Sequence, residues 1–470
     1  MSDEAFEAVV AAVRERVDPE ADERERLRAV AEEVIDRAEA AAAALPVETD
    51  AVQVGSTARG TWLAGDRDVD VFVRFPPDLP REKLESYGLE VGREVLPDGH
   101  EEYAEHPYVV GEFDGFQVDL VPCYRVPDAT EIQSAVDRTP FHTRYLDERL
   151  DEDLAAEVRA FKQFCKGIGV YGSDLRTRGL SGYLTELLVL AYGGFRETLE
   201  AAADWQPPVR LDPADHGRAG FDDPLVVIDP TDPERNVAAV TSATNVARLQ
   251  HHARAFLADP TVERCVPDDP DPLSAAAVSE HVDRRSTTPV AVRFDAPDLV
   301  DDQLYPQLRK SLSGVADELD RRGFDVFRTA TWAADGGGDG PDDTSDGDSA
   351  GDANPAVLLV ELAVAERPRV ERHEGPPVHV RQHAEGFYEK YDDEDAYGPF
   401  VDGDRYVVER DREFPTARAF LESDALLDVA LGVHVEEALA DGYDVLVGGE
   451  VAELAGEFGV ELARYVEPSP

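Results

Sequence analysis

Two aspartates separated by one residue are the first side chains in the sequence whose types and spacing indicate chemistry. Asp68 and Asp70 alternate with Val69 and Val71 at the start of an apolar run. Because side chains of a strand alternate between its two faces, both carboxylates would lie on one face and both valines on the other. Two negative charges at this distance repel each other, and carboxylate oxygens suit Mg²⁺. The spacing therefore predicts a Mg²⁺ site on a strand.

A glycine and a serine that precede this strand fit the phosphates that Mg²⁺ commonly binds. The apolar run 51–54 ends at Gly55, and Ser56 and Thr57 follow it. Glycine lets the backbone approach a ligand closely, and a helix that begins at the serine would turn its N-terminal N–H groups toward an anion. A helix N-cap is the alternative role for Ser56.

A third acid lies in a similar pattern further along the chain. Phe116, Val118 and Leu120 would form the apolar face of a strand, with Asp119 on the opposite face. A carboxylate among core-forming residues is costly unless something neutralises it. The chain has 100 acidic residues among 470, so one Asp-x-Asp pair is expected by chance. The third acid therefore favours a reaction centre over coincidence.

The elements that must position these acids follow from the hydrophobic periodicity and the turn residues. We expect helices over residues 3–17, 20–45 and 80–94, a polar loop over 99–106, and a hairpin of strands over 108–113 and 116–122 around Asp114-Gly115. A twisted mixed sheet backed by helices would then carry all three acids on its open side. Residues 139–221 read as mainly helical, and 226–239 as a strand, two Asp-Pro turns and a helix from near Asn236.

The second half of the chain begins after an Asp- and Pro-rich stretch, residues 267–273, which marks a boundary. We expect strands over 288–294, 324–331, 357–363 and 406–410, and helices over 304–322, 416–421 and 426–441. Residues 333–355 contain almost no apolar side chains, so they are expected to form a disordered loop that interrupts a hairpin-like pair of strands.

The composition indicates a surface adapted to salt. The formal net charge is −54, and the only lysines are Lys83, Lys162, Lys166, Lys310 and Lys390. At about 1 M ionic strength the Debye length is near 3 Å, so an acidic surface does not repel a polyanion beyond contact range. Nucleic acid therefore stays open as a partner, and an acidic protein without any RNA partner is the alternative.

No feature of the sequence indicates a disulfide framework or a membrane. Cys123, Cys165 and Cys265 lack the spacing of metal ligands and are expected to be buried free thiols. No apolar run approaches the roughly 18 residues of a membrane span, and the first residues do not form a signal peptide. We therefore expect a cytoplasmic protein with no membrane contact.

The motifs occur in an order that resembles a known family. Gly55-Ser56, Arg59-Gly60-Thr61, Asp68-x-Asp70 and the later Asp119 resemble the polymerase-β-type nucleotidyltransferase superfamily. Six further motifs resemble the archaeal, class I CCA-adding enzymes, which are tRNA nucleotidyltransferases. These are YAEHPY at 103–108, VDLVPCY at 118–124, RTPFH at 138–142, GVYG at 169–172, SGYL at 181–184 and DPTDPERNV at 229–237.

The resemblance implies a multidomain α/β and α+β enzyme from a halophilic archaeon. It would have a polymerase-β-like catalytic domain over 1–142, a mainly helical nucleotide-recognition domain over 143–270, and an α+β tRNA-binding region over 271–470. The implied activity is template-independent addition and repair of the 3′-terminal CCA of tRNA from CTP and ATP, with release of pyrophosphate. A poly(A)-polymerase-like or small-substrate nucleotidyltransferase is one alternative, and an RNA-binding protein with an inactive centre is another.

The resemblance also implies roles for individual residues. Asp68 and Asp70 would bind both Mg²⁺ ions of a two-metal site, and Asp119 the ion that activates the 3′-hydroxyl. The nucleotide would contact Gly55, Ser56, Arg59, His142, Lys162, Tyr171 and Arg235, the last of which would read the base. Other roles stay open: a surface position for Arg59, structural roles for His142 and Tyr171, Lys166 in place of Lys162, and pairing of Arg235 with Asp229 or Asp232.

Basic residues between 367 and 390 form the clearest candidate surface for binding RNA. Arg369, Arg372 and Arg381 lie in this segment, and they would hold the acceptor and TΨC stem through its phosphates. Salt bridges to Glu366, Glu371 and Glu374 are the alternative. Tyr103 and His106 are further candidates for RNA contact. The sequence leaves the oligomeric state open, a homodimer included.

Overall fold

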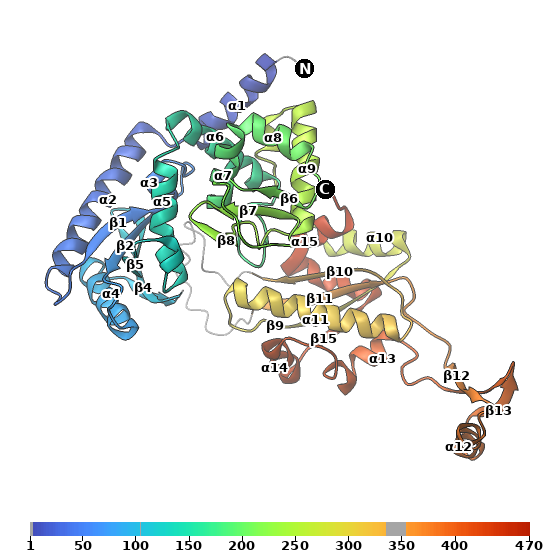
Figure 1. The fold of residues 1–470 in the computed structure, drawn as a ribbon. Helices are drawn as coiled ribbons and strands as arrows, with labels where there is room; N and C mark the ends of the chain where they lie inside the picture. The colour runs from blue at the N-terminus through green and yellow to red at the C-terminus, as the bar shows by residue number, and fades with distance from the viewer. Residues whose placement is uncertain (1–2, 104, 335–353) are drawn as a thin grey trace. The chain divides into compact units, whose positions relative to one another are not determined.

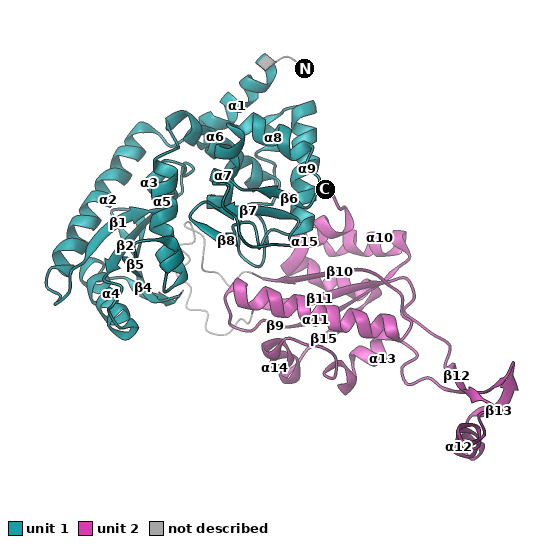
Figure 2. Ribbon diagram, in the orientation of Figure 1, with its two compact units in different colours: residues 1–268, 470 teal, residues 269–469 magenta. Residues whose placement is uncertain are grey.

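The computed structural model describes residues 3–103, 105–334 and 354–470. The chain divides into two compact units, residues 1–268 with residue 470, and residues 269–469 (Figure 2). The division falls inside the Asp- and Pro-rich stretch 267–273. In the described ranges no helix combines the length and the apolar character needed to cross a membrane. The three cysteines are buried free thiols, as expected.

The first part of unit 1 is a five-stranded mixed sheet in the order β1-β2-β5-β4-β3 (Figure 1). Its strands are β1 (Asp50–Val54), β2 (Asp68–Phe75), β3 (His100–Tyr103), β4 (Pro107–Phe113) and β5 (Phe116–Tyr124). Strands β2 and β5 are parallel, and the other pairs are antiparallel. The helices of this part are α2 (Ala21–Ala42), α3 (Gly55–Arg59) and α4 (Arg81–Val95), whereas α1 (Asp3–Val17) packs into the core of the helical part described below.

One face of this sheet is covered, and the other carries the acids. Val69 and Val71 of β2 and Val118 and Leu120 of β5 are buried in one core with residues of α2 and α4. The alternation of side chains then places the intervening aspartates on the opposite face, where Phe72, Val121 and Cys123 are buried further along the same strands. Apolar residues with period two therefore fix which way the acids point.

The hairpin around Asp114-Gly115 is present, but the polar loop expected over 99–106 is wrong. Asp114 and Gly115 have φ of 51° and 79°, as a two-residue type I′ turn requires. Residues His100–Tyr103 form β3, which pairs with β4 at the edge of the sheet. Every side chain of β3 is exposed. A strand that buries no side chain has no apolar alternation, so hydrophobic periodicity does not predict it.

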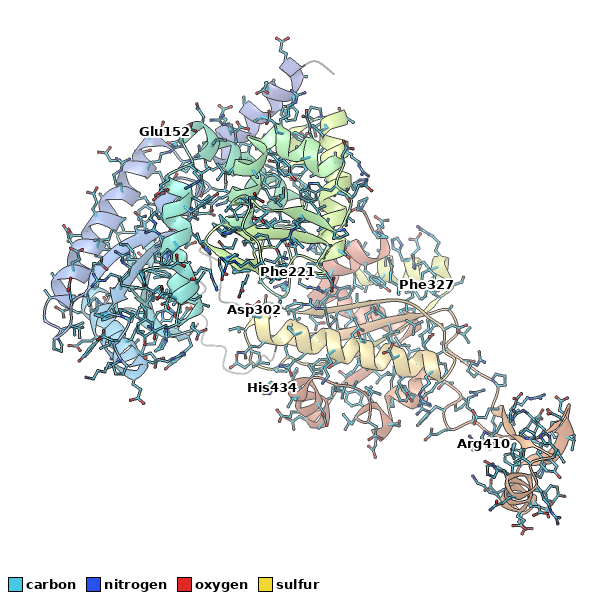
Figure 3. All side chains as sticks on the ribbon, in the orientation of Figure 1. Glu152, Phe221, Asp302, Phe327, Arg410 and His434 are labelled. Atoms are coloured by element: carbon cyan, nitrogen blue, oxygen red, sulfur yellow. The ribbon has the colours of Figure 1, made fainter. Side chains whose placement is uncertain are left out.

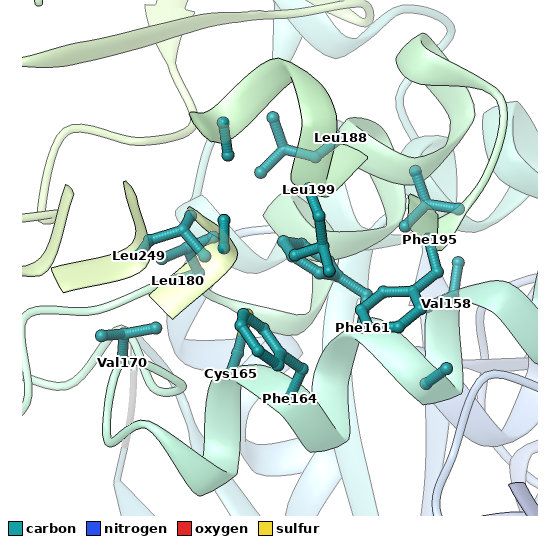
Figure 4. Packing of buried hydrophobic residues seen from close by; sticks show 14 of the residues in the cluster. Val158, Phe161, Phe164, Cys165, Val170, Leu180, Leu188, Phe195, Leu199 and Leu249 are labelled. Atoms are coloured by element: carbon teal, nitrogen blue, oxygen red, sulfur yellow. The ribbon is translucent and has the colours of Figure 1, made fainter. Parts of the chain in front are cut away.

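The second part of unit 1 is a helical bundle with a small sheet. Its helices are α5 (Thr139–Asp147), α6 (Glu152–Gly167), α7 (Gly182–Tyr192), α8 (Phe195–Ala203) and α9 (Ala243–Ala258), and its strands are β6 (Val209–Leu211), β7 (Leu225–Asp229) and β8 (Asp232–Asn236). Figure 4 shows the core, in which Phe164 packs edge-on against Phe195 of α8. Both phenylalanines also pack edge-on against Phe256 of α9.

The helix expected near Asn236 is wrong, because residues up to Asn236 form β8. The Asn236 side chain accepts a hydrogen bond from the Val227 N–H at 2.8 Å and donates one to the Leu225 carbonyl at 3.1 Å. These bonds tie the residue to the backbone of β7. The next helix, α9, begins after Ser242, whose hydroxyl accepts from the Asn245 N–H.

Unit 2 contains a four-stranded sheet in the order β10-β11-β9-β15. Its elements are β9 (Thr288–Asp295), β10 (Val326–Ala333), β11 (Pro355–Leu362), β15 (Asp444–Val447), α10 (Ala275–Arg285), α11 (Asp301–Arg321) and α15 (Ala455–Val466). Alternate residues of β9 belong to two different cores, Val290 and Val292 with α11, and Ala291 with α10 and α15. The sheet is therefore covered on both faces.

The expected strands and the expected helix of this sheet are confirmed, as is the pairing of the strands that flank the insert. Strands β10 and β11 are antiparallel neighbours. Most of the insert, predicted as a disordered loop over 333–355, lies outside the described residues.

A smaller part of unit 2 consists of three strands in the order β12-β14-β13 and one helix. Its elements are β12 (Val370–Pro377), α12 (Arg381–Asp392), β13 (Tyr397–Asp402) and β14 (Arg405–Asp411). Arg410 of β14, labelled in Figure 3, forms an ion pair with Glu371 of β12 at 2.9 Å. Helix α13 (Ala417–Leu421) follows, and the helix expected over 426–441 begins only after Gly432, as α14 (Val433–Asp441).

Candidate active site

Three carboxylates lie on the face of the first sheet that is opposite to its main core. Asp68 and Asp70 belong to β2, and Asp119 belongs to the parallel strand β5. In the register of these two strands Asp70 lies opposite Asp119. Two adjacent parallel strands therefore bring together acids that are about fifty residues apart in the sequence.

The electrostatics of these acids favour a bound cation. Burial, with the charges of Asp119 and Asp68 adding to it, raises the pKa of Asp70 to about 7. Burial and the charge of Asp68 together raise the pKa of Asp119 to about 6. The Oδ1 atom of Asp119 is buried and finds no hydrogen-bond partner in the described residues. A hard cation would relieve the repulsion and satisfy this oxygen.

The three carboxylates lie near each other, but they are not arranged as the ligands of a single metal ion. Nowhere in the described ranges do three His, Cys, Asp or Glu side chains stand close enough to hold one ion. Asp68, Asp70 and Asp119 offer only oxygen donors, which suits Mg²⁺ better than a soft metal. The residues fit the ion chemically, and their side chains must turn toward it.

Gly55 lies against Asp70 and can only be glycine in this backbone. Its φ is 78°, which L-residues rarely adopt, and a Cβ there would overlap the Asp70 Oδ2 atom. Helix α3 begins at Gly55 with Val54 as its N-cap, so the alternative of Ser56 as N-cap is wrong. The serine lies in the first turn, next to the acidic face.

Arg59 is not a surface arginine, because a buried carboxylate of α7 holds it. Its Nη2 donates to Glu186 Oε2 at 2.8 Å and its Nε to Oε1 at 3.2 Å, and its Nη1 donates to the Thr143 hydroxyl at 3.1 Å. The alternative of a surface position for Arg59 is therefore wrong, and its contact with the triphosphate stays a prediction. Its guanidinium is committed to Glu186, although its charge still acts on Asp70.

Lys162 belongs to the same network. Its Nζ donates to the Thr61 carbonyl at 3.0 Å and lies 3.7 Å from Glu186 Oε1, and the Thr61 hydroxyl also donates to Glu186. Lys166 is instead exposed and pairs with Asp66 at 3.4 Å. Lys162 is therefore the lysine of the Glu186 network, whereas the charge of Lys166 acts on Asp68. Which of the two lysines contacts the nucleotide stays a prediction.

Tyr171 lies beside Lys162. A Cβ added to Gly182 would stand 3.2 Å from the Tyr171 hydroxyl and 3.6 Å from Lys162 Nζ. Burial, with the charge of Glu186 adding, raises the pKa of the tyrosine, so its hydroxyl stays protonated and can donate. Gly182 at the start of α7 leaves room for both groups.

A second network centres on Asp229 at the end of β7. His142 Nε2 lies 2.8 Å from Asp229 Oδ2, and Arg235 Nη1 donates to the same oxygen at 2.8 Å. The His142 ring stacks on Tyr183 with centroids 3.9 Å apart, and the tyrosine hydroxyl donates to Asp229 Oδ1 at 3.3 Å. Thr231 donates to Oδ1 through its N–H and its hydroxyl. The alternative pairing of Arg235 with Asp229 is therefore present.

This pairing does not bury Arg235, whose side chain remains 35% exposed. The two networks meet on α5, where the adjacent residues His142 and Thr143 reach Asp229 and Arg59 respectively. Burial by itself would raise the pKa of Asp229, but hydrogen bonds from His142 and Thr231 lower it. Asp229 is therefore a charged, buried acceptor that holds an arginine at the edge of the site.

Asp229→Asn is expected to destabilise the protein by about 3 kcal/mol, because it leaves Arg235 and His142 without their buried counter-charge. The pKa of Asp229 is lowered in the folded state, so its contribution is present above the ordinary carboxyl pKa and is lost as the pH falls. Thermal unfolding of both proteins at neutral and acid pH measures the difference, which should shrink in acid. Asp402→Asn, which breaks an exposed pair with Arg372, is the control and should cost less than about 1 kcal/mol.

Sequence reasoning missed Glu186 as part of the site and gave Asp229 no role beyond an alternative partner for Arg235. Glu186 did leave a signal, since it is the only charged residue in the otherwise apolar run of α7. Asp229 similarly ends the apolar strand β7. A lone acid among core residues needs a cation nearby, so this pattern indicates that both Glu186 and Asp229 have buried cationic partners.

The candidates for RNA contact have different outcomes. Tyr103 is 78% exposed, so its ring is available to a ligand, whereas His106 is only 2% exposed and its Nδ1 lies 3.3 Å from Glu85 Oε1. The burial of His106 contradicts the expected RNA contact. The remaining candidates are exposed arginines that carry ion pairs, Arg369 with Asp411, Arg372 with Asp402 and Arg381 with Glu385.

The mixed sheet, its three acids and the neighbouring glycine define a nucleotidyltransferase. The family model named Nucleotidyltransferase domain matches residues 35–142, and tRNA nucleotidyltransferase, second domain, matches 156–265. CCA-adding enzyme, C-terminal domain, matches 285–337 and 346–448. The chain belongs to the CCA-adding enzyme family.

Similar proteins support this membership over the full length. The CCA-adding enzyme of Haloarcula marismortui is 67% identical over 100% of both chains. That of Halobacterium salinarum is 62% identical over 98% of each chain, and that of Methanosarcina barkeri is 41% identical over 97%. The resemblance, which carried motifs only up to residue 237, thus extends through unit 2.

Proposed function

We propose that this protein builds and repairs the 3′-terminal CCA of tRNA, adding nucleotides from CTP and ATP without a template and releasing pyrophosphate. The observation that carries the proposal is the pairing of Asp70 with Asp119 across two parallel strands, beside a glycine that only fits without a side chain. Full-length similarity to CCA-adding enzymes supports the choice of tRNA. A cytoplasmic location follows from this substrate.

In this proposal Asp68, Asp70 and Asp119 hold Mg²⁺. When bound, the ions lower the pKa of the attacking 3′-hydroxyl and neutralise the charge of the transferring phosphate. The chain supplies the rest. Gly55 leaves space beside Asp70, and Asp119 keeps one buried oxygen without a hydrogen-bond partner in the described residues.

The triphosphate is proposed to lie against Gly55 and Ser56, with Arg59, Lys162 and Tyr171 as donors. The base is proposed to lie near His142 and Arg235. Because Asp229 fixes one side of the Arg235 guanidinium, its remaining N–H groups can face the acceptor edge of cytosine or adenine. The stacked rings of His142 and Tyr183 both contact Asp229, the carboxylate that holds this arginine.

The proposed domains are 1–142, 143–270 and 271–470, the last of which grips the tRNA. Arg381→Gln is expected to weaken tRNA binding two- to fivefold at low salt. The slope of log K against log salt concentration should fall by about 1, which corresponds to one lost phosphate contact. Its exposed pair with Glu385 gives little stability, so folding should be unaffected. Filter binding over a salt series measures the slope. Arg196→Gln in unit 1 is the matched control, since this arginine also pairs with a glutamate four residues on and should leave the slope unchanged.

The experiment that tests the function incubates the purified protein in high salt with tRNA that lacks its last three nucleotides. Each nucleoside triphosphate is supplied separately and then in pairs. Addition of C from CTP, followed by A only after both cytidines, supports the proposal. Addition of A alone would indicate a poly(A)-polymerase-like enzyme, and binding without addition would indicate an inactive centre. Sedimentation of the same sample tests whether it is a homodimer.

A further inference from the structure

Glu186 is a fully buried carboxylate at the centre of three donors. Arg59 binds both of its oxygens, with Nη2 to Oε2 at 2.8 Å and Nε to Oε1 at 3.2 Å. The Thr61 hydroxyl donates to Oε1, and Lys162 Nζ stands 3.7 Å from the same atom. One buried negative charge therefore serves two cations, and the carboxylate of Asp147 on α5 also interacts with Arg59.

The partners of Glu186 come from the elements that surround the proposed triphosphate. Arg59 ends α3, the helix that starts at Gly55, and Thr61 follows it two residues later. Lys162 belongs to α6, while Glu186 itself belongs to α7. Glu186 thus reaches from the helical bundle into the segment that carries the glycine and serine beside the acids.

The carboxylate also decides whether Lys162 can carry its charge. Burial lowers the pKa of Lys162, the charge of Glu186 raises it, and Arg59 lowers it again. Among more distant groups Asp66 raises it and Lys166 lowers it. A buried ammonium without a nearby carboxylate would lose its proton near neutral pH. Glu186 is the nearest acid to this lysine.

We propose that Glu186 is a positioning residue for the nucleotide, holding the Arg59 guanidinium and the Lys162 ammonium beside Gly55 and Ser56 so that both cations meet the triphosphate. It does not itself contact the substrate, and this role rests on the proposed function. Because the fork of Arg59 is fixed by two hydrogen bonds, little side-chain freedom is lost when phosphate oxygens arrive.

Glu186→Gln tests this role, since it keeps the shape of the side chain and removes its charge. We expect the KM for CTP and for ATP to rise about tenfold or more, with a change in kcat of less than about threefold, because binding contacts are lost in ground state and transition state alike. Calorimetric titration of CTP with Mg²⁺ into the whole protein should show the same weakening. Because the charge of Glu186 raises the pKa of Lys162, the variant should lose affinity at a lower pH than the wild type as the pH rises.

Glu361→Gln is the matched control. Glu361 of β11 is also buried and accepts two hydrogen bonds from Arg285, at 2.7 and 3.0 Å, and one from the Thr287 hydroxyl. It lies in unit 2, so its loss should lower thermal stability without changing the affinity for CTP. A comparable loss of CTP affinity in this control would mean that Glu186→Gln acts through stability alone.

The outcomes separate this inference from the proposed function. If the wild type fails to add C and A to the shortened tRNA, the function is wrong. If the wild type adds both and Glu186→Gln binds CTP equally well or more tightly, only the role of Glu186 is wrong. If Glu186→Gln does not fold, Glu186→Asp keeps the charge. The aspartate variant should then fold and bind CTP with the pH dependence of the wild type. A purely packing role predicts instead that the shorter aspartate also fails to fold.

Discussion

Asp70→Asn should reduce nucleotide addition by about 10³-fold or more while making the metal-free protein more stable. Activity is lost because the carboxylate that lies between the other two acids is removed from the proposed metal site. Stability rises because Asp70 is buried, and its pKa of about 7 is above the ordinary value of 3.8. The protonated Asp70 stabilises the fold fully below the ordinary pKa of 3.8. This contribution to the free energy of unfolding falls as the pH rises and is lost above about 7.

At pH 8 the metal-free protein therefore carries a buried, repelled charge that asparagine does not have. We expect an increase in the free energy of unfolding of up to about 3 kcal/mol, measured by thermal unfolding with a chelator in high salt. Mg²⁺ should stabilise the wild type and have little effect on the variant. Asp78→Asn, at an exposed position after β2, is the control and should leave both activity and stability unchanged. A variant that is inactive and also less stable at every pH would contradict this account of the acidic face.

Gly55→Ala is expected to lower activity about 100-fold and stability by about 2 to 3 kcal/mol. Two effects contribute, since alanine is strained at a φ of 78° and its Cβ overlaps the carboxylate of Asp70. Either Asp70 or the start of α3 must move, and both belong to the proposed site. Steady-state kinetics with CTP and unfolding in the same buffer measure the two quantities.

Gly60→Ala separates strain from contact. Gly60 has a φ of 67°, similar to that of Gly55, but a Cβ there meets nothing within 4 Å in the described structure. We expect it to cost about 1 to 2 kcal/mol of stability with activity retained. Equal activity losses in the two variants would show that backbone strain alone matters, and the close approach of Gly55 to Asp70 would then have no part in the chemistry.

The sheet face that carries Asp68, Asp70 and Asp119 shows what can be predicted from local residue patterns and what cannot. Alternation with period two is a local property, so Val69 and Val71 were enough to predict the direction of Asp68 and Asp70. The flanking residues of Asp119 gave its direction in the same way. The pairing of Asp70 with Asp119 is not local, because it depends on the register between strands β2 and β5. Helix α4 lies between these two strands in the sequence.

The errors have a common cause, which is that an element without its own apolar pattern leaves no periodic signal. Strand β3 exposes every side chain, and Asn236 belongs to β8 because its amide pairs with the backbone of β7. Both are decided by a neighbouring strand. The buried His106 similarly looks like a polar loop residue until β4 and α4 enclose it.

Residue types and their order were sufficient to predict a Mg²⁺ site on one strand face, because the alternation of acids with apolar residues and the glycine before them are constraints that each segment satisfies locally. The chemical class came from the resemblance of the ordered motifs to a known family. They could not give the counter-charges. Arg59 meets Glu186 across 127 residues, and His142 meets Asp229 across 87. A charge is paired with whatever lies within a few ångströms once helices and strands have packed, so partners of this kind follow from packing in three dimensions and not from spacing along the chain.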